Sequence, residues 1–131
     1  ATPLGALALV IVLDQFPRNL HRGTHLAFAA DAHARRIARA ALPWAGALTP
    51  VQRVFLYLPF EHAEDIADQD RSVALFESLR GEGDYEAVID YARRHRAVIA
   101  RFGRFPHRNA ALGRASTAEE IVYLAEPGAG F

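Results

Sequence analysis

The segment Tyr85–Phe102, YEAVIDYARRHRAVIARF, carries the clearest structural pattern in the sequence. Its apolar stripe consists of Tyr85, Val88, Ala92, Ile99 and Phe102. Steps of three, four and seven residues place side chains on one face of an α-helix. Gly103 follows at once, in the position where a glycine commonly ends a helix. The segment therefore predicts an amphipathic helix that ends at Phe102.

Helix caps and prolines predict five further helices around this segment. Thr2-Pro3 and Thr49-Pro50 each place an N-cap before a proline, which is typical of a helix start. Pro17 and Pro59 are expected to end helices, because a proline disfavours helical geometry in the residue before it. The expected helices run from Pro3 to about Asp14, Thr24 to Leu42, Pro50 to just before Pro59, about Glu61 to Leu79, Tyr85 to Phe102, and from a Ser116–Glu119 or Thr117–Glu120 capping box to near Pro127.

No β-hairpin turn or alternation of apolar and polar residues accompanies the strand-like run 10–12. We therefore expect an all-α fold of about six helices in stacked antiparallel hairpins. A chain of 131 residues with 51% apolar residues is long enough for one domain, residues 1–131, with its own core. Because the chain starts inside a helix signal and has no Met, we expect an N-terminal segment to be missing. The first helix should then expose apolar surface or self-associate, through Leu4, Leu7, Val10 and Ile11.

The composition limits the classes of partner. There is no cysteine, which excludes a disulfide framework, a zinc–thiolate site and a thiol nucleophile. The net charge is zero, so we expect no nucleic-acid partner, and the longest apolar run, Leu4–Leu13, is about half the length that spans a bilayer. A cytoplasmic protein without a membrane partner is expected. Residues 61–90 hold ten acids and residues 91–114 seven arginines, which predicts charge pairing across a helical hairpin.

Two similar corners follow long helices. Phe16-Pro17-Arg18-Asn19 is echoed by Phe105-Pro106-His107-Arg108-Asn109. The aromatic residue is expected to anchor each turn, and nearby arginines supply the forked donors that hold a carboxylate or phosphate bidentately. These arginines are Arg18, Arg22, Arg104 and Arg108. The alternative is structural, with each asparagine capping the next helix and each arginine binding helix carbonyls.

A third polar cluster lies at Glu61-His62, between these corners in sequence. A histidine with an orienting carboxylate can serve as a general base. The spacing lacks a second histidine one helical turn away, so neither a metal site nor any other cofactor is expected. Glu64 and Asp65 are expected to act as first-turn acids of the next helix. His95 is expected to be a hydrogen-bonded core residue, and Asp70 to pair with a buried arginine.

Three ordered blocks carry a resemblance to a known family. They are Asp14-Gln15-Phe16-Pro17-Arg18-Asn19, Phe55-Leu56-Tyr57-Leu58-Pro59-Phe60-Glu61-His62 with Glu64-Asp65, and Arg101-Phe102-Gly103-Arg104-Phe105-Pro106-His107-Arg108-Asn109. These blocks resemble the signatures of the domain of unknown function 924 family over essentially the whole chain. The resemblance implies a tetratricopeptide-like helical fold and candidate positions, and it implies no reaction.

Three hypotheses for function stay open. In the first, the two corners and the Glu61-His62 turn form one pocket that binds an anionic small molecule or an acidic peptide. Its residues are Asp14, Arg18, Asn19, Arg22, Glu61, His62, Arg104, His107, Arg108 and Asn109. The second is a hydrolase in which His62 or His107 is the base and Glu61 orients it. In the third the motifs are purely structural. A shared site requires Arg18 and Arg108 to lie near His62, with Asp14 or Glu61 offsetting their charge.

Overall fold

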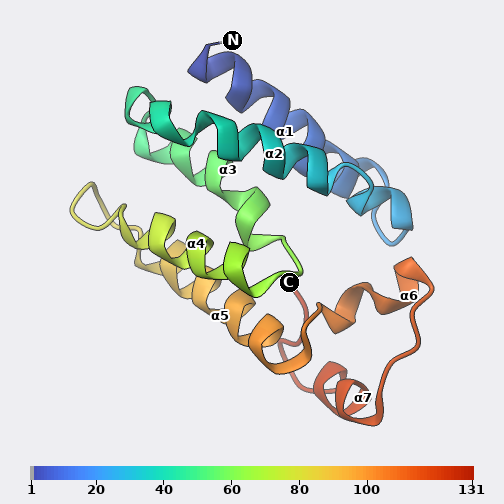
Figure 1. Ribbon diagram of the computed structural model, residues 1–131. Coiled ribbons are helices and arrows are strands. Elements are labelled where there is room, and N and C mark those ends of the chain that lie inside the picture. The colour runs from blue at the N-terminus through green and yellow to red at the C-terminus, as the bar shows by residue number, and fades with distance from the viewer. Residues whose placement is uncertain (1) are drawn as a thin grey trace.

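A computed structural model describes residues 2–131. Those residues form seven α-helices and three short 3-10 helices, and no strand (Figure 1). The elements are α1 (Pro3–Leu20), η1 (His25–Phe28), α2 (Asp31–Ala41), η2 (Leu42–Ala47), α3 (Pro50–Glu61), α4 (Ile66–Glu77), α5 (Glu86–Phe102), η3 (Pro106–Arg108), α6 (Asn109–Leu112) and α7 (Ala118–Leu124). The all-α prediction is confirmed, and the expected number of about six helices is close.

Two antiparallel helix pairs build the molecule. Helices α1 and α2 lie side by side in one pair, and α4 and α5 lie side by side in the other (Figure 1). Helix α3 packs against α1 and α2 on one side and against α4 on the other, so it joins the two pairs. The C-terminal ends of α1 and α3 point toward the region where η3 and α6 follow α5 (Figure 1). Segments far apart in sequence therefore meet at this end of the stack.

The core follows α3 through both pairs. Leu56, Phe60 and Phe76 are fully buried between α3 and α4, and Ile89 of α5 closes the same cluster. Each such side chain stabilises the fold by about 1.5–3 kcal/mol through removal from water. On α2 the core residues are small, and Ala34 and Ala38 are completely buried there, whereas α1 contributes Leu7 and Val10. Small side chains at such a contact allow two helices to approach closely.

The predicted helix caps are confirmed. The Thr2 hydroxyl accepts a hydrogen bond from the Gly5 N–H at 2.9 Å. Thr49 forms a capping box with Gln52, and of the two alternatives for the last helix it is Thr117 that forms one. Gly103 ends α5 with a φ of 74°, a conformation that costs glycine little. These caps satisfy backbone groups that a helix leaves unpaired at its ends.

Two prolines that were expected to end helices lie inside them. Pro17 sits in α1, which continues to Leu20, and Pro59 sits in α3, which continues to Glu61. A proline inside a helix removes one N–H donor and crowds the preceding turn. Both helices end within three residues of their proline, so each helix loses only this one donor near its end. The expected ends at Asp14 and before Pro59 are therefore wrong.

Other helix boundaries also shift. The expected helix over residues 24–42 divides into η1 and α2, with a break at residues 29–30. The expected helix from Glu61 begins instead at Ile66, after a turn in which the Asp65 carboxylate accepts the Asp68 N–H at 3.0 Å. That turn leaves residues 62–65 free to make tertiary contacts. The predicted charge pairing joins α4 and α5 through Arg93–Glu77 and Arg96–Asp70. Arg96 is exposed, so the expectation that Asp70 pairs with a buried arginine is wrong.

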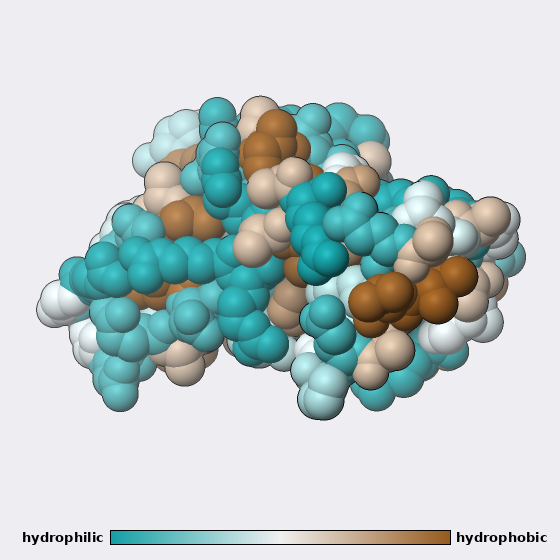
Figure 2. Space-filling model, turned by 90° about the horizontal axis from the view of Figure 1, so that it is seen from below, coloured by the Kyte–Doolittle hydropathy of each residue, from teal (hydrophilic) through white to brown (hydrophobic). Residues whose placement is uncertain are grey.

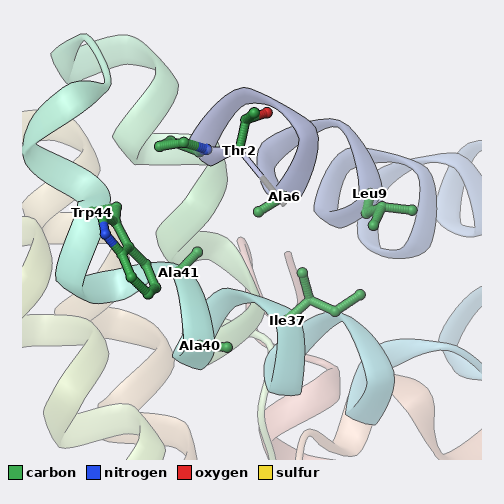
Figure 3. Close-up of a pocket in the computed structure, with 8 residues that line it drawn as sticks. Thr2, Ala6, Leu9, Ile37, Ala40, Ala41 and Trp44 are labelled. Carbon is green, nitrogen blue, oxygen red and sulfur yellow. The ribbon is translucent and has the colours of Figure 1, made fainter.

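The face seen in Figure 2 is mostly hydrophilic, with apolar side chains gathered in a few patches. Leu4 and Leu9 of α1 are 60% and 51% exposed, whereas Leu7 and Val10 are core residues. Exposure of the first helix was thus correctly predicted for Leu4 and wrongly predicted for Leu7 and Val10. Leu9 and the exposed Trp44 line an apolar cleft of about 430 Å³ between α1 and the α2–η2 segment (Figure 3). Among the described residues, no helix combines the length and hydropathy needed to cross a membrane.

Candidate functional site

A cavity of about 470 Å³ lies where the ends of α1 and α3 meet α5 and the second corner. Six of the ten residues proposed from the sequence line it, namely Arg18, Arg22, Glu61, His62, His107 and Arg108. Further walls come from Phe28, Tyr91, His95 and Phe131. The cavity is in the size range typical of small-molecule sites.

The other proposed residues take different places. Asp14 is buried behind His62. Asn19 is exposed on the last turn of α1, and Arg104 points to α7, where it binds Glu120 at 2.7 and 2.9 Å. Asn109 is buried and bonds to the 114–116 segment rather than capping a helix. The structure therefore does not bring Asn19, Arg104 or Asn109 to the cavity.

The two corners are not geometrically equivalent. Phe105 is completely buried and anchors its corner, as expected. Phe16 is 51% exposed on the last turns of α1, so the expectation that it anchors the first corner is wrong. The reason is that the first motif is helical throughout, and its phenylalanine falls on the outer face of α1. Of the residue types that the two corners share, only the arginines, Arg18 and Arg108, lie close together.

Asp14 and His62 form a buried carboxylate–imidazole pair. The distance from Nδ1 of His62 to Oδ1 of Asp14 is 2.7 Å. Burial lowers the pKa of His62 despite its partner, while His62 and Arg18 hold the pKa of Asp14 below its usual range despite burial. A neutral imidazole facing an ionised carboxylate must donate through Nδ1, which leaves Nε2 as the proton acceptor. The hydrolase hypothesis assigned the orienting role to Glu61, and the geometry assigns it to Asp14.

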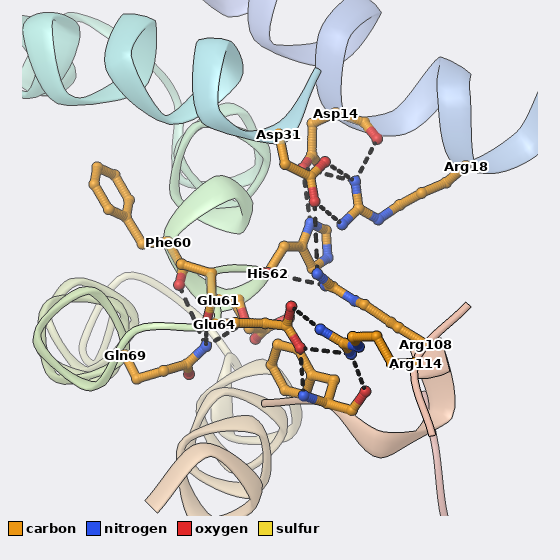
Figure 4. A network of polar contacts seen from close by, with 12 residues as sticks. Asp14, Arg18, Asp31, Phe60, Glu61, His62, Glu64, Gln69, Arg108 and Arg114 are labelled. Atoms are coloured by element: carbon orange, nitrogen blue, oxygen red, sulfur yellow. Dashed lines mark hydrogen bonds and ion pairs between the residues drawn. The ribbon is translucent and has the colours of Figure 1, made fainter. Parts of the chain in front are cut away.

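Arg18 and Arg108 meet around Asp31 and Phe28 (Figure 4 shows the polar part). Arg18 binds the Asp31 carboxylate bidentately, at 2.7 and 2.9 Å. Nη1 of Arg108 lies 3.7 Å from the same carboxylate, and its Nη2 donates to the His62 carbonyl at 2.8 Å. The guanidinium carbons lie 5.4 and 4.5 Å from the centre of the Phe28 ring. The carboxylates that offset the two cations are therefore Asp14 and Asp31, so of the two expected alternatives, Asp14 or Glu61, it is Asp14 that contacts an arginine.

Arg108 is the most deeply buried of these cations, at 5% exposure. Its Nε makes no hydrogen bond within residues 2–131. Burial and the neighbouring charge of Arg18 lower the pKa of Arg108 to about 10. The group stays charged at neutral pH, and the low value reflects chiefly its burial, which the charges of Asp31 and Glu64 offset only in part.

Glu61, His95 and His107, which also line the cavity, are neutral near pH 7. Burial and the charge of Asp14 raise the pKa of Glu61 to about 8. Burial lowers the pKa of His95 to about 3, and burial together with Arg108 lowers that of His107 to about 4. His95 also donates through Nδ1 to the Tyr91 carbonyl at 2.8 Å, in line with its expected core role. Around the cavity, four arginines, Arg18, Arg22, Arg108 and Arg114, stand against the carboxylates of Asp14, Asp31 and Glu64, so the formal charge of the surroundings is positive.

The sequence did not predict the two residues that hold the 61–65 turn, Gln69 and Glu64, in this role. Nε2 of Gln69 donates to the carbonyls of Glu61 and Ala63 at 2.6 and 2.8 Å. Glu64 accepts the Phe105 N–H at 2.6 Å and binds Arg114 at 2.8 and 3.0 Å. Glu64 was expected only as a first-turn acid, and it instead joins the turn to the second corner. These contacts fix the backbone that carries His62.

A signal for Gln69 was present in the sequence. Gln69 occupies an inward position within the apolar stripe of α4, between Ile66 and Val73. A polar residue on a buried helix face needs hydrogen-bond partners, so such a position predicts a local contact. Asp31 offered no comparable signal, because an acid in the first turn of a helix is common for electrostatic reasons alone.

Within residues 2–131, no group of three His, Cys, Asp or Glu side chains is arranged to hold a metal ion.

Comparisons with known proteins place the chain in a family. The family model described as bacterial protein of unknown function (DUF924) matches residues 1–128. A solved structure of a protein of unknown function from Agrobacterium tumefaciens is similar, with a TM-score of 0.85 and 46% sequence identity. The match covers 94% of this chain and 68% of that chain. No curated protein matches the sequence. The chain therefore belongs to the DUF924 family.

Proposed function

We propose that the cavity binds a small molecule that carries a carboxylate or phosphate group. The observation that supports this most is Arg108, a buried cation whose Nε makes no hydrogen bond within residues 2–131 and whose ion pair with Asp31 spans 3.7 Å. Its Nη1 lies 3.7 Å from Asp31, too far for a hydrogen bond, and keeps donors for a ligand. A buried charge without adequate partners costs several kcal/mol, and an incoming anion would offset part of that cost.

Arg22 and Arg18 complete the proposed anion site. Arg22 is exposed at the cavity rim, where it can steer an anion inward. Arg18 is held in place by its two bonds to Asp31. A guanidinium that is already oriented loses less conformational entropy on binding than a free one. A small ligand suits the volume of about 470 Å³ better than an acidic peptide, which serves as a comparison ligand.

Calorimetry tests this proposal. Wild-type protein is titrated with phosphate, pyrophosphate, acetate, succinate and an acidic tripeptide, at low ionic strength. We expect binding of at least one small anion, and a loss of tenfold or more in Arg108→Ala and of a few-fold in Arg22→Ala. Arg36→Ala is the matched control, because Arg36 is exposed on α2 away from the cavity. Circular dichroism checks that each variant is folded.

Absence of binding by every anion to the wild-type protein would leave the purely structural hypothesis. Equal losses in Arg108→Ala and Arg36→Ala would show a general charge effect rather than a site. Stronger binding of the tripeptide than of any small anion would favour an acidic peptide as the ligand.

The Asp14–His62 pair favours hydrolysis as a second candidate function. Nε2 of His62 would take a proton from water as the water oxygen attacks an ester carbonyl or phosphoryl centre. The proton would then pass to the leaving alcohol. The nitrophenyl esters of acetate and phosphate are suitable probes, and His62→Gln should lower any turnover by about 10²–10⁴-fold. Turnover that is unchanged in this variant, or absent in the wild type, would remove this candidate.

A further inference from the structure

An apolar groove beside the cavity lies between α3 and α5. Its volume is about 240 Å³. Its apolar walls come from three helices and include Val54, Leu58, Phe76 and Val88. Leu58, Glu61 and Tyr91 line both this groove and the arginine-lined cavity. The two hollows are therefore neighbours with a shared boundary.

The helix registers show how the hollows are aligned. Val54, Leu58 and Glu61 follow one another on α3 at steps of four and three residues, which places them on one face. On α5, Val88 and Tyr91 form the opposite wall, and His95 continues it into the cavity. Seven residues of helix span roughly 10 Å, so the groove leads from Val54 to the polar end over that distance. An elongated ligand could occupy both hollows along one line.

Glu61 at the boundary does not interrupt this path. It is 3% exposed and is protonated near neutral pH, since its pKa is raised to about 8 by burial and by the charge of Asp14. A neutral carboxyl does not repel an anion nearby, and it imposes a smaller desolvation cost on an apolar chain than an ionised one. The side-chain charges that line the two hollows are concentrated on the arginines at one end.

We propose that the ligand is a small amphiphile whose anionic head binds at Arg108 and whose apolar tail lies in the groove between α3 and α5. This inference rests on the proposed function. A groove of about 240 Å³ has room for about eight water-sized groups, which sets a tail of roughly four to eight carbons. The polarity of the hollows, cationic at one end and apolar at the other, matches a ligand with one charged end.

The test is a chain-length series measured by calorimetry. Straight-chain carboxylates from acetate to decanoate, and monoalkyl phosphates from methyl to octyl, are titrated into wild-type protein. Each added methylene should strengthen binding about two- to fourfold until about eight carbons, and further methylenes should add little. The same series on Ala87→Phe fills the groove from an exposed lining position. That variant should bind the shortest anions normally and lose the gain with length.

Ala100→Phe, at an exposed position of α5 outside both hollows, is the matched control and should keep the full chain-length gain. If inorganic phosphate or acetate binds but longer tails add nothing, the amphiphile inference is wrong while the proposed function stands. If no ligand of either series binds, the proposed function fails with it. A chain-length gain that persists in Ala87→Phe would place the tail elsewhere and overturn the assignment to this groove.

Discussion

Arg18 and Arg108 come from opposite ends of the chain and share one carboxylate, that of Asp31. Arg18 binds it at 2.7 and 2.9 Å, whereas Nη1 of Arg108 stays 3.7 Å away. Asp31 thus satisfies Arg18 and leaves Arg108 undercompensated. In the proposed site, the negative charge of Asp31 therefore determines how strongly Arg108 attracts an anionic ligand.

Asp31→Asn should therefore strengthen anion binding. The amide keeps an oxygen that accepts from Arg18 but removes a negative charge beside Arg108, so the site becomes more positive. We expect phosphate or carboxylate affinity to rise about three- to tenfold, a change of about 0.7–1.4 kcal/mol. Calorimetry against the wild type measures it, and weaker binding in the variant would contradict the electrostatic account.

Asp14→Asn should destabilise the fold. Asp14 is 1% exposed and pairs with both His62 and Arg18, and removal of one partner from a buried charged cluster is costly. We expect the free energy of unfolding to fall by about 2–4 kcal/mol. Asp70→Asn is the control, because the Asp70–Arg96 pair is exposed and such pairs contribute about 0–1 kcal/mol. Urea denaturation measures both variants, and equal losses in the free energy of unfolding would contradict the assignment of Asp14 to a buried charged cluster.

Glu61 should make stability fall as the pH rises. Its pKa is about 8 in the folded protein and near 4.5 when unfolded, so the folded state holds a proton that the unfolded state releases between these values. The stabilisation by neutral Glu61 is complete below about pH 4.5 and is lost progressively up to about pH 8. The histidines, with lowered folded pKa values, act in the opposite direction, because near pH 6.5 the unfolded state binds protons that the folded state does not, and this contribution fades toward pH 8.

Between pH 6.5 and 8 we therefore expect the free energy of unfolding of the wild type to fall relative to that of Glu61→Gln by about 1 kcal/mol per pH unit. Glu61→Gln cannot ionise at this position, so it keeps only the histidine contribution, which raises its stability over the same range. Urea denaturation at several pH values measures both proteins. Parallel curves for the two would mean that Glu61 is ionised in the folded protein.

Self-association through the first helix stays a prediction. Leu4 and Leu9 leave apolar surface on α1, beside the cleft that Trp44 lines. If two copies meet there, sedimentation should show a dimer at high protein concentration, and Leu9→Glu should shift it to monomer. Leu9 is half exposed, so the variant should keep its fold. A wild type that sediments as a monomer at every concentration would remove this prediction.

Local signals in the sequence were sufficient for much of the fold. The apolar stripe of residues 85–102 and Gly103 predicted α5 to within one residue, and the threonine caps located three helix starts. Pro17 and Pro59 led to wrong expected helix ends, because a proline near the end of a helix removes only one N–H donor and tertiary packing outweighs that loss. Local propensity could not include this packing.

The candidate site was only partly predictable. Arg18 and Arg108 were singled out because polar residues recur at the two corners, and His62 because a carboxylate residue precedes it, and the structure brings the three together. Asp31 was missed because its importance lies in which distant side chains reach it, a property of the folded chain alone. The same holds for Arg104, which faces α7 because Glu120 lies there to receive it.

An NMR titration that observes arginine Nε–Hε and histidine side-chain signals is the most direct test for an anion site at Arg108. Inorganic phosphate is added to isotope-labelled wild-type protein at low ionic strength. If the cavity binds phosphate, the Arg108 and His62 signals should show saturable shifts, with little change at the exposed Arg36. Shifts that are absent at Arg108, or that spread evenly over exposed arginines such as Arg36, would contradict an anion site in the cavity.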